Sequence, residues 1–394
     1  MKALLHKTSV SFASAMACAA GLLLGASPAS AQVQGVTKDT IKIGMHNSLT
    51  GPIAVFGLTY ERVARLLIDK TNAQGGFNGR KIELITEDDR GDPGGGVAAV
   101  TKLIDRDKVF LVLGGAYTPV TLAAFPRVVE KDIIYWSPAS STPLLTKPFK
   151  KLTFQAQLPL DDHALAVVNL AASMKPRKIG FIGENNEYGK VTHDAAVEVL
   201  STKKLKIDVD ETIEPNATSA AAQVSKFKSA GVDVILHGGT PRALAFIIRE
   251  IYKQGVKAPL ISFGGGSAAS IFELVEGEAP IEYYAVSPLA CQLTEPCTAE
   301  FNKAWKEKYP SEPPLVWTAQ GYAAIQMFLE GLRRAGPDLT SAKLIETFEN
   351  MPEFKSPIIP YPMKFSATSH RSVRGGYLDG FKNGKHHFFG DEIK

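Results

Sequence analysis

Short apolar runs alternate with longer amphipathic stretches from residue 40 onward. Residues 41–45 and 82–86 are rich in isoleucine and other apolar residues, whereas residues 60–72 carry apolar side chains at helical spacing. Strands of this kind, separated by helices of about 10 to 15 residues, are typical of a parallel sheet with helices on both faces. The first series consists of strands 41–45, 82–86, 109–113 and 133–136 and of helices 60–72, 97–105 and 122–130.

A second series of the same kind follows Leu158. It consists of strands 178–182, 205–213, 232–236 and 260–263 and of helices 164–174, 188–200, 221–230 and 244–254. Two such series in tandem predict an α/β protein of two Rossmann-like lobes, each built on a parallel sheet.

The region after Tyr284 does not begin a third series. It contains one long helical pattern, residues 322–334, and a proline-rich stretch, residues 351–363. We expect this region to complete the two lobes, which are then joined by several crossings that form a hinge beside a cleft. The expected lobes are 35–157 with about 286–360 and 158–285 with about 361–394.

The amino terminus has the pattern of a cleavable secretory signal peptide, residues 1–31. Lys2 and Lys7 precede an apolar stretch, and Ala29-Ser30-Ala31 is an A-x-A cleavage site. Cys18 precedes the most apolar part of the stretch, which does not favour lipid attachment. No later stretch is apolar over the roughly 20 residues that a spanning helix needs. We expect an exported, soluble mature chain that begins at Gln32.

Charge and cysteine content narrow the function further. The chain has 44 basic and 40 acidic residues, with neither a basic block nor interleaved basic and aromatic residues, which argues against nucleic acid or an anionic membrane as a partner. Without the signal peptide only Cys291 and Cys297 remain, and an oxidising compartment favours a disulfide between them over two free thiols. No second Cys or His pair accompanies them, so we expect neither a metal nor a cofactor.

Polar residues follow the strands of the first lobe at the positions where open parallel sheets bind ligands. Thr118-Pro119, preceded by Tyr117, is a natural helix start, and the free N–H groups and positive potential of a helix N-terminus suit a carboxylate. Ser140 and Ser141 add donors after the next strand, and Phe56 offers an aromatic wall. Each loop alone is also compatible with an ordinary capped turn, but all converge on one sheet edge.

The second lobe offers further candidates after its own strands. Glu184 and Tyr188 follow one strand, and Arg242 falls in the first turn of a helix after another. Sequence spacing leaves open whether Arg242 faces the cleft or solvent, and whether Tyr188 is a cleft or a core aromatic. Ser267 lies in a glycine-rich loop after the strand 260–263.

Several motifs together resemble a known family. They are Ile41-Lys42-Ile43-Gly44, Leu49-Thr50-Gly51-Pro52, the stretch 72–84, Asp88-Asp89-Arg90-Gly91-Asp92-Pro93, Gly114-Gly115 and Ser137-Pro138-Ala139. Over the mature chain the sequence is similar to the branched-chain amino-acid (leucine-binding-like) proteins of the type I periplasmic binding family. The resemblance implies a monomeric, non-enzymatic binding protein of the periplasm that delivers a small carboxylate-bearing solute, a branched-chain or other amino acid, to the membrane permease of an ABC importer.

The resemblance also assigns roles to residues. The family's carboxylate-binding positions fall on Thr118, Ser140 and Ser141, and its two ligand-covering aromatic positions fall on Phe56 and Tyr188. Amino-acid-binding relatives usually have an acid for the ligand ammonium after the strand 260–263, where this chain has Gly-Gly-Gly-Ser. Either Glu184 or another acid replaces it, or the ligand is an aromatic or other carboxylate without an ammonium, because a buried unpaired ammonium is costly.

An enzyme is the alternative from another class. Residues 265–269 follow a strand and approximate the nucleophile elbow of an α/β hydrolase, with Ser267 as nucleophile. The second glycine of that motif is Ala269 here, and no acid and histidine partners are identifiable. We therefore expect a binding protein in which Ser267 belongs to a cleft loop.

Overall fold

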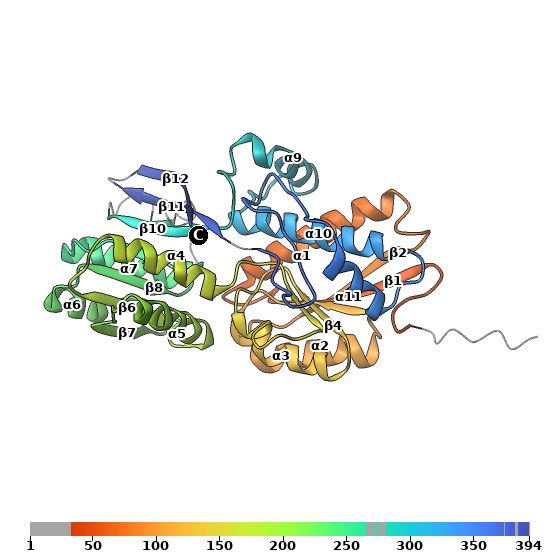
Figure 1. Cartoon of the computed structure of the whole chain (residues 1–394), viewed down its shortest axis with the longest axis horizontal. Coiled ribbons are helices and arrows are strands. Elements are labelled where there is room, and N and C mark those ends of the chain that lie inside the picture. The colour runs from red at the N-terminus through yellow and green to blue at the C-terminus, as the bar shows by residue number, and fades with distance from the viewer. Residues whose placement is uncertain are drawn as a thin grey trace, which may run out of the picture.

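Two mainly parallel sheets, each covered by helices, form two lobes that lie side by side (Figure 1). The computed structural model describes residues 33–264, 271, 274–275, 281–373, 375–382 and 385–393. The expected signal peptide and Ser267 lie outside these residues. None of the helices in the described ranges has the length and hydropathy needed to cross a bilayer.

The first sheet has the strand order β2-β1-β3-β4-β5 and is parallel throughout. Every residue of β3 and β4 is buried, because helices cover both faces of the sheet. The strands are β1 (Thr40–Asn47), β2 (Lys81–Asp88), β3 (Leu111–Leu113), β4 (Ile134–Ser137) and β5 (Thr153–Gln155). The helices are α1 (Ala54–Ala73), α2 (Pro93–Thr101), which continues into a π-helical turn (Lys102–Arg106), and α3 (Thr118–Glu130).

The second sheet has the order β12-β11-β10-β9-β8-β6-β7 and is parallel from β10 to β7. The strands are β6 (Ile179–Glu184), β7 (Val209–Ile213), β8 (Val234–Gly238), β9 (Leu260–Ser262), β10 (Tyr283–Ser287), β11 (Gly376–Lys382) and β12 (Lys385–Ile393). The helices are α4 (Leu160–Ser173), α5 (Glu187–Thr202), α6 (Ala221–Ala230) and α7 (Pro241–Gln254).

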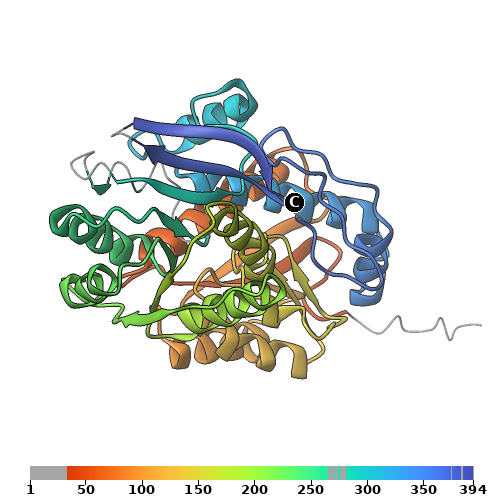
Figure 2. The same cartoon turned by 60° about the vertical axis from the view of Figure 1, so that its left-hand side comes forward.

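The sequence pattern did not reveal β5 or β10 to β12. The last two form an antiparallel hairpin beside β10, which Figure 2 shows as blue ribbons.

The segment between the two halves of the second sheet packs on the first lobe. Its helices are α9 (Ala299–Lys308), α10 (Val316–Ala335) and α11 (Ser341–Asn350), and α10 lies along α1. Phe365 packs against Phe154 with ring centroids 5.1 Å apart, and Arg371 bridges to Gln155. Parts of residues 361–373 therefore pack against the first lobe before the chain enters β11.

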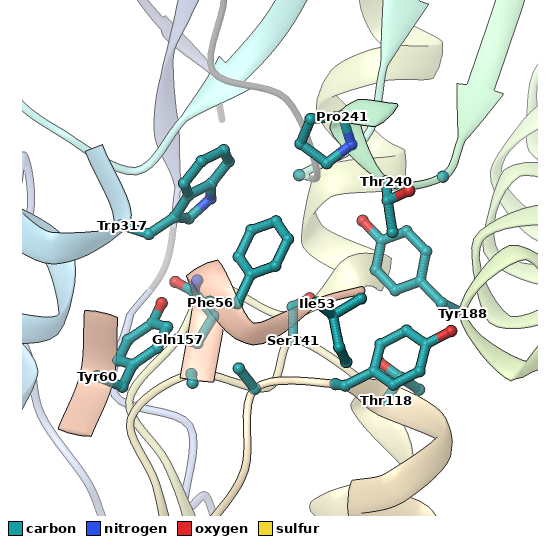
Figure 3. A pocket seen from close by; sticks show the side chains of 15 residues that line it. Ile53, Phe56, Tyr60, Thr118, Ser141, Gln157, Tyr188, Thr240, Pro241 and Trp317 are labelled. Atoms are coloured by element: carbon teal, nitrogen blue, oxygen red, sulfur yellow. The ribbon is translucent and has the colours of Figure 1, made fainter. Parts of the chain in front are cut away.

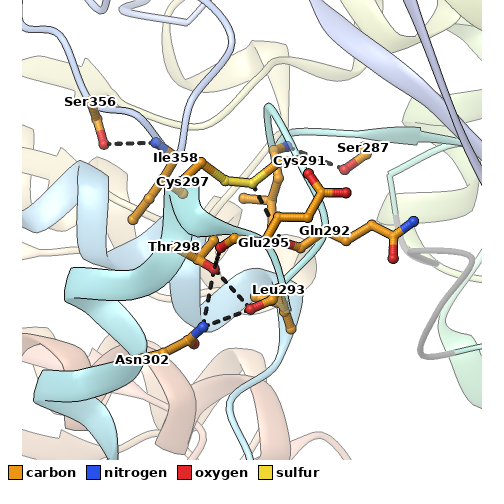
Figure 4. Close-up of a disulfide and its surroundings, with 11 residues drawn as sticks. Ser287, Cys291, Gln292, Leu293, Glu295, Cys297, Thr298, Asn302, Ser356 and Ile358 are labelled. Atoms are coloured by element: carbon orange, nitrogen blue, oxygen red, sulfur yellow. Dashed lines mark hydrogen bonds between the residues drawn. A yellow bond between two sulfur atoms is a disulfide. The ribbon is translucent and has the colours of Figure 1, made fainter.

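A disulfide joins Cys291 and Cys297 in the loop that precedes α9 (Figure 4), with their Cα atoms 6.6 Å apart. Within this loop the carbonyl oxygen of Leu293 accepts hydrogen bonds from the Thr298 hydroxyl (2.8 Å) and from Asn302 Nδ2 (2.6 Å). The disulfide and these bonds together tie the loop to the start of α9. This loop lies on the first lobe, and its cysteines do not line the pocket between the lobes.

Candidate ligand-binding site

A pocket of about 80 Å³ lies between the two lobes, at the carboxyl ends of their strands (Figure 3). Phe56 stands near its centre, with Trp317 on one side and Tyr188 on the other. The first lobe contributes Ile53, Phe56, Tyr60, Ala116, Tyr117, Thr118, Ala139, Ser141, Gln157 and Trp317, and the second contributes Tyr188, Gly239, Thr240, Pro241 and Gly264.

The pocket brings together many of the residues predicted from the sequence. Phe56, Tyr117, Thr118, Ser141 and Tyr188 all line it. The side chain of Tyr188 lines the cleft and also packs against the hydrophobic core.

Three other predicted residues lie elsewhere. Ser140 is fully buried behind the pocket, where its carbonyl accepts a hydrogen bond of 2.9 Å from Gln155 Nε2. Its side chain is thus not part of the pocket lining, because the chain turns inward between Ala139 and Ser141. Glu184 and Arg242 line a neighbouring hollow further out in the cleft.

A buried network positions the loop that leads into α3. The Gly115 N–H donates to His46 Nε2 (3.2 Å), so His46 Nδ1 carries the proton and donates to Asp89 Oδ2 (3.0 Å). The Tyr135 hydroxyl also contacts His46 Nε2 (2.9 Å). A Cβ atom at Gly115 would lie 2.8 Å from the His46 ring, so only glycine allows this approach. The sequence did not point to this network, because its members come from different strands.

The start of α3 presents hydrogen-bond donors to the pocket. Thr118 is the first residue of the helix, and its side chain lines the cavity together with Ser141. The first turn of a helix has backbone N–H groups without intrahelical acceptors, and it carries the positive end of the helix dipole. This edge of the pocket is therefore suited to an anion.

Aromatic rings form most of the remaining wall. The rings of Phe56 and Trp317 meet edge to face with centroids 5.0 Å apart. Gly57 lets the start of α1 lie against the loop after β1, because a Cβ atom there would lie 2.1 Å from the carbonyl oxygen of Ser48. Trp317 and Tyr60 were not predicted as site residues, since their positions in apolar helices α10 and α1 resemble core positions in sequence.

None of the described residues that line the inner pocket carries a full charge at neutral pH. The nearby carboxylate of Glu184 is 2% exposed and accepts hydrogen bonds from Thr240 N–H (2.9 Å), from the Thr240 hydroxyl and from Asn186 Nδ2 (2.9 Å). Burial, followed by the Glu184 charge, raises the pKa of Tyr188 and of Tyr117, so both phenols stay neutral. Glu184 is therefore satisfied within its own lobe.

A direct hydrogen bond connects the lobes across the cleft. Asn186 Nδ2 lies 3.2 Å from the Tyr117 hydroxyl and donates to it. Asn186 also caps α5 by accepting from the N–H groups of Tyr188 and Gly189. The second lobe is thus held against the loop that precedes α3.

Two buried histidines close the second-lobe wall. A Cβ atom at Gly264 would lie 2.5 Å from the His163 ring, and one at Gly239 would lie 2.7 Å from His237 Nε2. Burial lowers the pKa of His163 to about 4 and that of His237 to about 3. Both imidazoles are therefore neutral at physiological pH.

Because these two histidines are buried in the neutral form, we expect the free energy of unfolding to fall in acid. Their folded pKa values lie below the unfolded value, so the unfolded chain binds more protons, and the stability is lost as pH falls below about 6.5. For each histidine, the free energy of unfolding should drop by about 2 kcal/mol between about pH 7 and about pH 5.

Urea denaturation at several pH values measures this effect. His163→Gln should flatten the pH dependence whatever it does to absolute stability, whereas His193→Gln, at a half-buried histidine of α5 that lies 3.0 Å from Asp210, serves as the comparison. If the free energy of unfolding of His163→Gln depends on pH as strongly as that of the unmodified protein, His163 is not a source of the acid sensitivity.

Two α/β lobes that enclose a small pocket between them define a solute-binding protein. Within the described residues, no group of three or more His, Cys, Asp or Glu is arranged to hold a metal.

Comparison with known proteins agrees with this class. Residues 40–385 match the family model described as periplasmic binding protein. The chain is 28% identical over 301 residues to a Leu/Ile/Val-binding protein homolog 1 of Brucella abortus, a match that covers 75% of this chain and 79% of the relative.

Solved structures of the same fold include two proteins whose names state a solute. The branched-chain amino acid transporter substrate-binding protein LivJ from Streptococcus pneumoniae, in complex with isoleucine, has a TM-score of 0.76 at 22% identity, covering 89% of this chain and 98% of that one. A fatty acid ABC transporter substrate-binding protein from Thermomonospora curvata has a TM-score of 0.80 at 21% identity, covering 92% and 94%. Both likenesses concern the fold.

The chain belongs to the periplasmic binding protein family, in its type I form. Members of this family are solute-binding proteins and not enzymes. The type I α/β fold and the family resemblance predicted from the sequence are both confirmed.

Proposed function

We propose that this protein captures a small apolar carboxylate between its two lobes in the periplasm and delivers it to the membrane permease of an ABC importer. The observation that carries the proposal is the uncharged, aromatic pocket built against the first turn of α3. A carboxylate at this turn accepts hydrogen bonds from backbone N–H groups and from the hydroxyls of Thr118 and Ser141.

The apolar part of the solute packs among the rings of the pocket. Phe56, Trp317 and Tyr60 supply the first-lobe wall, and Tyr188 covers the solute from the second lobe. Closure of the lobes about the hinge buries the solute, and the bond between Tyr117 and Asn186 stabilises the closed form.

Amino acids are one candidate class, because they appear in the names of relatives such as the Leu/Ile/Val-binding homolog and the isoleucine complex. An amino acid brings an ammonium, which needs an anionic partner when it is buried. The lining formed by described residues of the inner pocket has no acid, and the oxygens of Glu184 already accept hydrogen bonds from Thr240 and Asn186. This arrangement favours a carboxylate without an ammonium, aromatic or aliphatic.

A matched pair of solutes tests the proposal. An amino acid and its des-amino analogue, such as phenylalanine and 3-phenylpropionate, are titrated side by side by calorimetry. We expect the des-amino acid to bind tighter by about tenfold or more, because burial of an unpaired ammonium is unfavourable by several kcal/mol.

Glu184→Gln separates the two classes of solute. A preference for the amino acid that disappears in this variant would show that Glu184 provides the counter-charge and that the solute is an amino acid. If neither solute nor other small carboxylates bind, the carboxylate proposal fails as a whole.

A further inference from the structure

A larger hollow of about 470 Å³ continues the inner pocket toward the mouth of the cleft. The two cavities share lining residues from both lobes, namely Ile53, Phe56, Tyr117, Thr240, Pro241 and Trp317. A solute that extends past Phe56 and Trp317 therefore enters the outer hollow without leaving the cleft.

The second-lobe wall of the outer hollow carries positive charge. Arg242, Ala245, Phe246 and Arg249 all line it and are spaced along one face of α7. Arg242 is exposed and takes part in none of the ion pairs between described residues. Arg249 donates from Nη2 to the carbonyl oxygen of Leu274 (2.8 Å), which leaves its charge without a carboxylate partner in the described chain.

No described residue of this lining neutralises the two arginines. Glu184 is its one acidic member within the described part of the chain, and that carboxylate is buried and hydrogen-bonded to Thr240 and Asn186. The opposite wall, from the first lobe, is mostly apolar and includes Pro52, Val55 and Trp317. Val55 is 53% exposed, although it is apolar. The outer hollow thus joins an apolar wall to two guanidinium groups.

We propose that the outer hollow is a second subsite, which binds a second anionic group, so that the solute is an elongated apolar molecule with a carboxylate at each end. This inference rests on the proposed function, because the first carboxylate lies at the start of α3. Guanidinium groups bind carboxylates through two parallel hydrogen bonds, which an ammonium does not reproduce. Arg242 and Arg249 would then select for the second charge.

The test compares straight-chain α,ω-dicarboxylates, from succinate to azelate, with their monomethyl esters by calorimetry. Each ester keeps the length and one carboxylate of its diacid but lacks the second charge. We expect a diacid of one optimal length to bind roughly tenfold tighter than its ester, since charge-assisted hydrogen bonds are about twice as strong as neutral ones. This preference should shrink as salt rises, because the arginines are exposed.

Variants of α7 assign the effect to the arginines. Arg242→Ala and Arg249→Ala should each reduce the affinity for the diacid about three- to tenfold and leave the affinity for the ester unchanged. Lys253→Ala removes the same charge from the far end of α7, where Lys253 pairs with Glu250, and is the matched control. Thermal unfolding of each variant shows whether its fold is intact.

Two results would overturn the inference. The first is equal affinity for diacid and ester in the unmodified protein, and the second is a diacid preference that survives the double replacement of Arg242 and Arg249. Monocarboxylates that bind and respond to Thr118→Ala, without any gain from a second carboxylate, would remove the outer subsite and leave the proposed function standing. Failure of every mono- and dicarboxylate to bind would remove both.

Discussion

Replacement of Thr118 and Ser141 together by alanine is expected to weaken carboxylate binding by about 2 to 5 kcal/mol, or roughly 30- to 5000-fold. Both hydroxyls line the inner pocket at the positive end of α3. Their removal leaves a desolvated carboxylate with fewer hydrogen-bond donors. Loss of each donor is expected to weaken the binding free energy by about 1 to 3 kcal/mol. We expect Ser141→Ala to be the more severe single change.

Calorimetric titration of the single and double variants measures this loss. Both side chains line the pocket, so the midpoint of thermal unfolding without ligand should stay close to that of the unmodified protein. Thr347→Ala, on an exposed turn of α11, is the control for loss of a hydroxyl away from the pocket. Unchanged affinity in the double variant would exclude these two side chains from the binding site.

Phe365→Ala is expected to lower the free energy of unfolding of the first lobe by about 3 to 5 kcal/mol. Phe365 is 1% exposed, and its ring centroid lies 5.1 Å from that of Phe154, 5.9 Å from that of Phe348 and 6.5 Å from that of Trp136. These partners come from β5, α11 and β4, so the substitution opens a cavity where separate segments of the chain meet.

Hydrogen exchange locates the destabilised region. In Phe365→Ala, the amides of β4, β5 and α11 should exchange faster, while those of β6 and β8 remain protected. The control is Phe381→Ala, which removes a ring stacked on Tyr283 in the second sheet and should produce the converse pattern. Faster exchange in the second sheet of Phe365→Ala would show that residues 361–373 do not belong to the first lobe.

Much of the architecture could be predicted from local patterns. Apolar runs and helical periodicity identify most strands and helices up to β9, because in a parallel sheet each strand is buried on both faces. Short β5 and the hairpin of β11 and β12 were missed, since β5 has only three residues and the apolar residues of β11 are interrupted by Asp379 and Gly380, which leaves little periodicity. Their pairing depends on partners far away in the chain, as in Gln155 with Arg371.

Some residues of the candidate site could likewise be predicted from the sequence, and others could not. Thr118, Ser141 and Phe56 were found because each follows a strand, and strand ends meet at one edge of a parallel sheet. Trp317 and Tyr60 were missed because α10 and α1 place them on helices whose apolar pattern suggests only core packing. Their exposure to the pocket follows from how α10 lies along α1, which local sequence does not encode.

The sequence alone therefore determined the class of fold, the family and the strand-end loops, because these depend on interactions between neighbouring residues and on the period of the sheet. Only the tertiary structure decided the directions of Glu184 and Arg242. Glu184 is turned toward donors in its own lobe, and Arg242 lines the outer hollow. A charged side chain is directed by the partners within reach and by the solvent it retains, and both are set by how the two lobes meet.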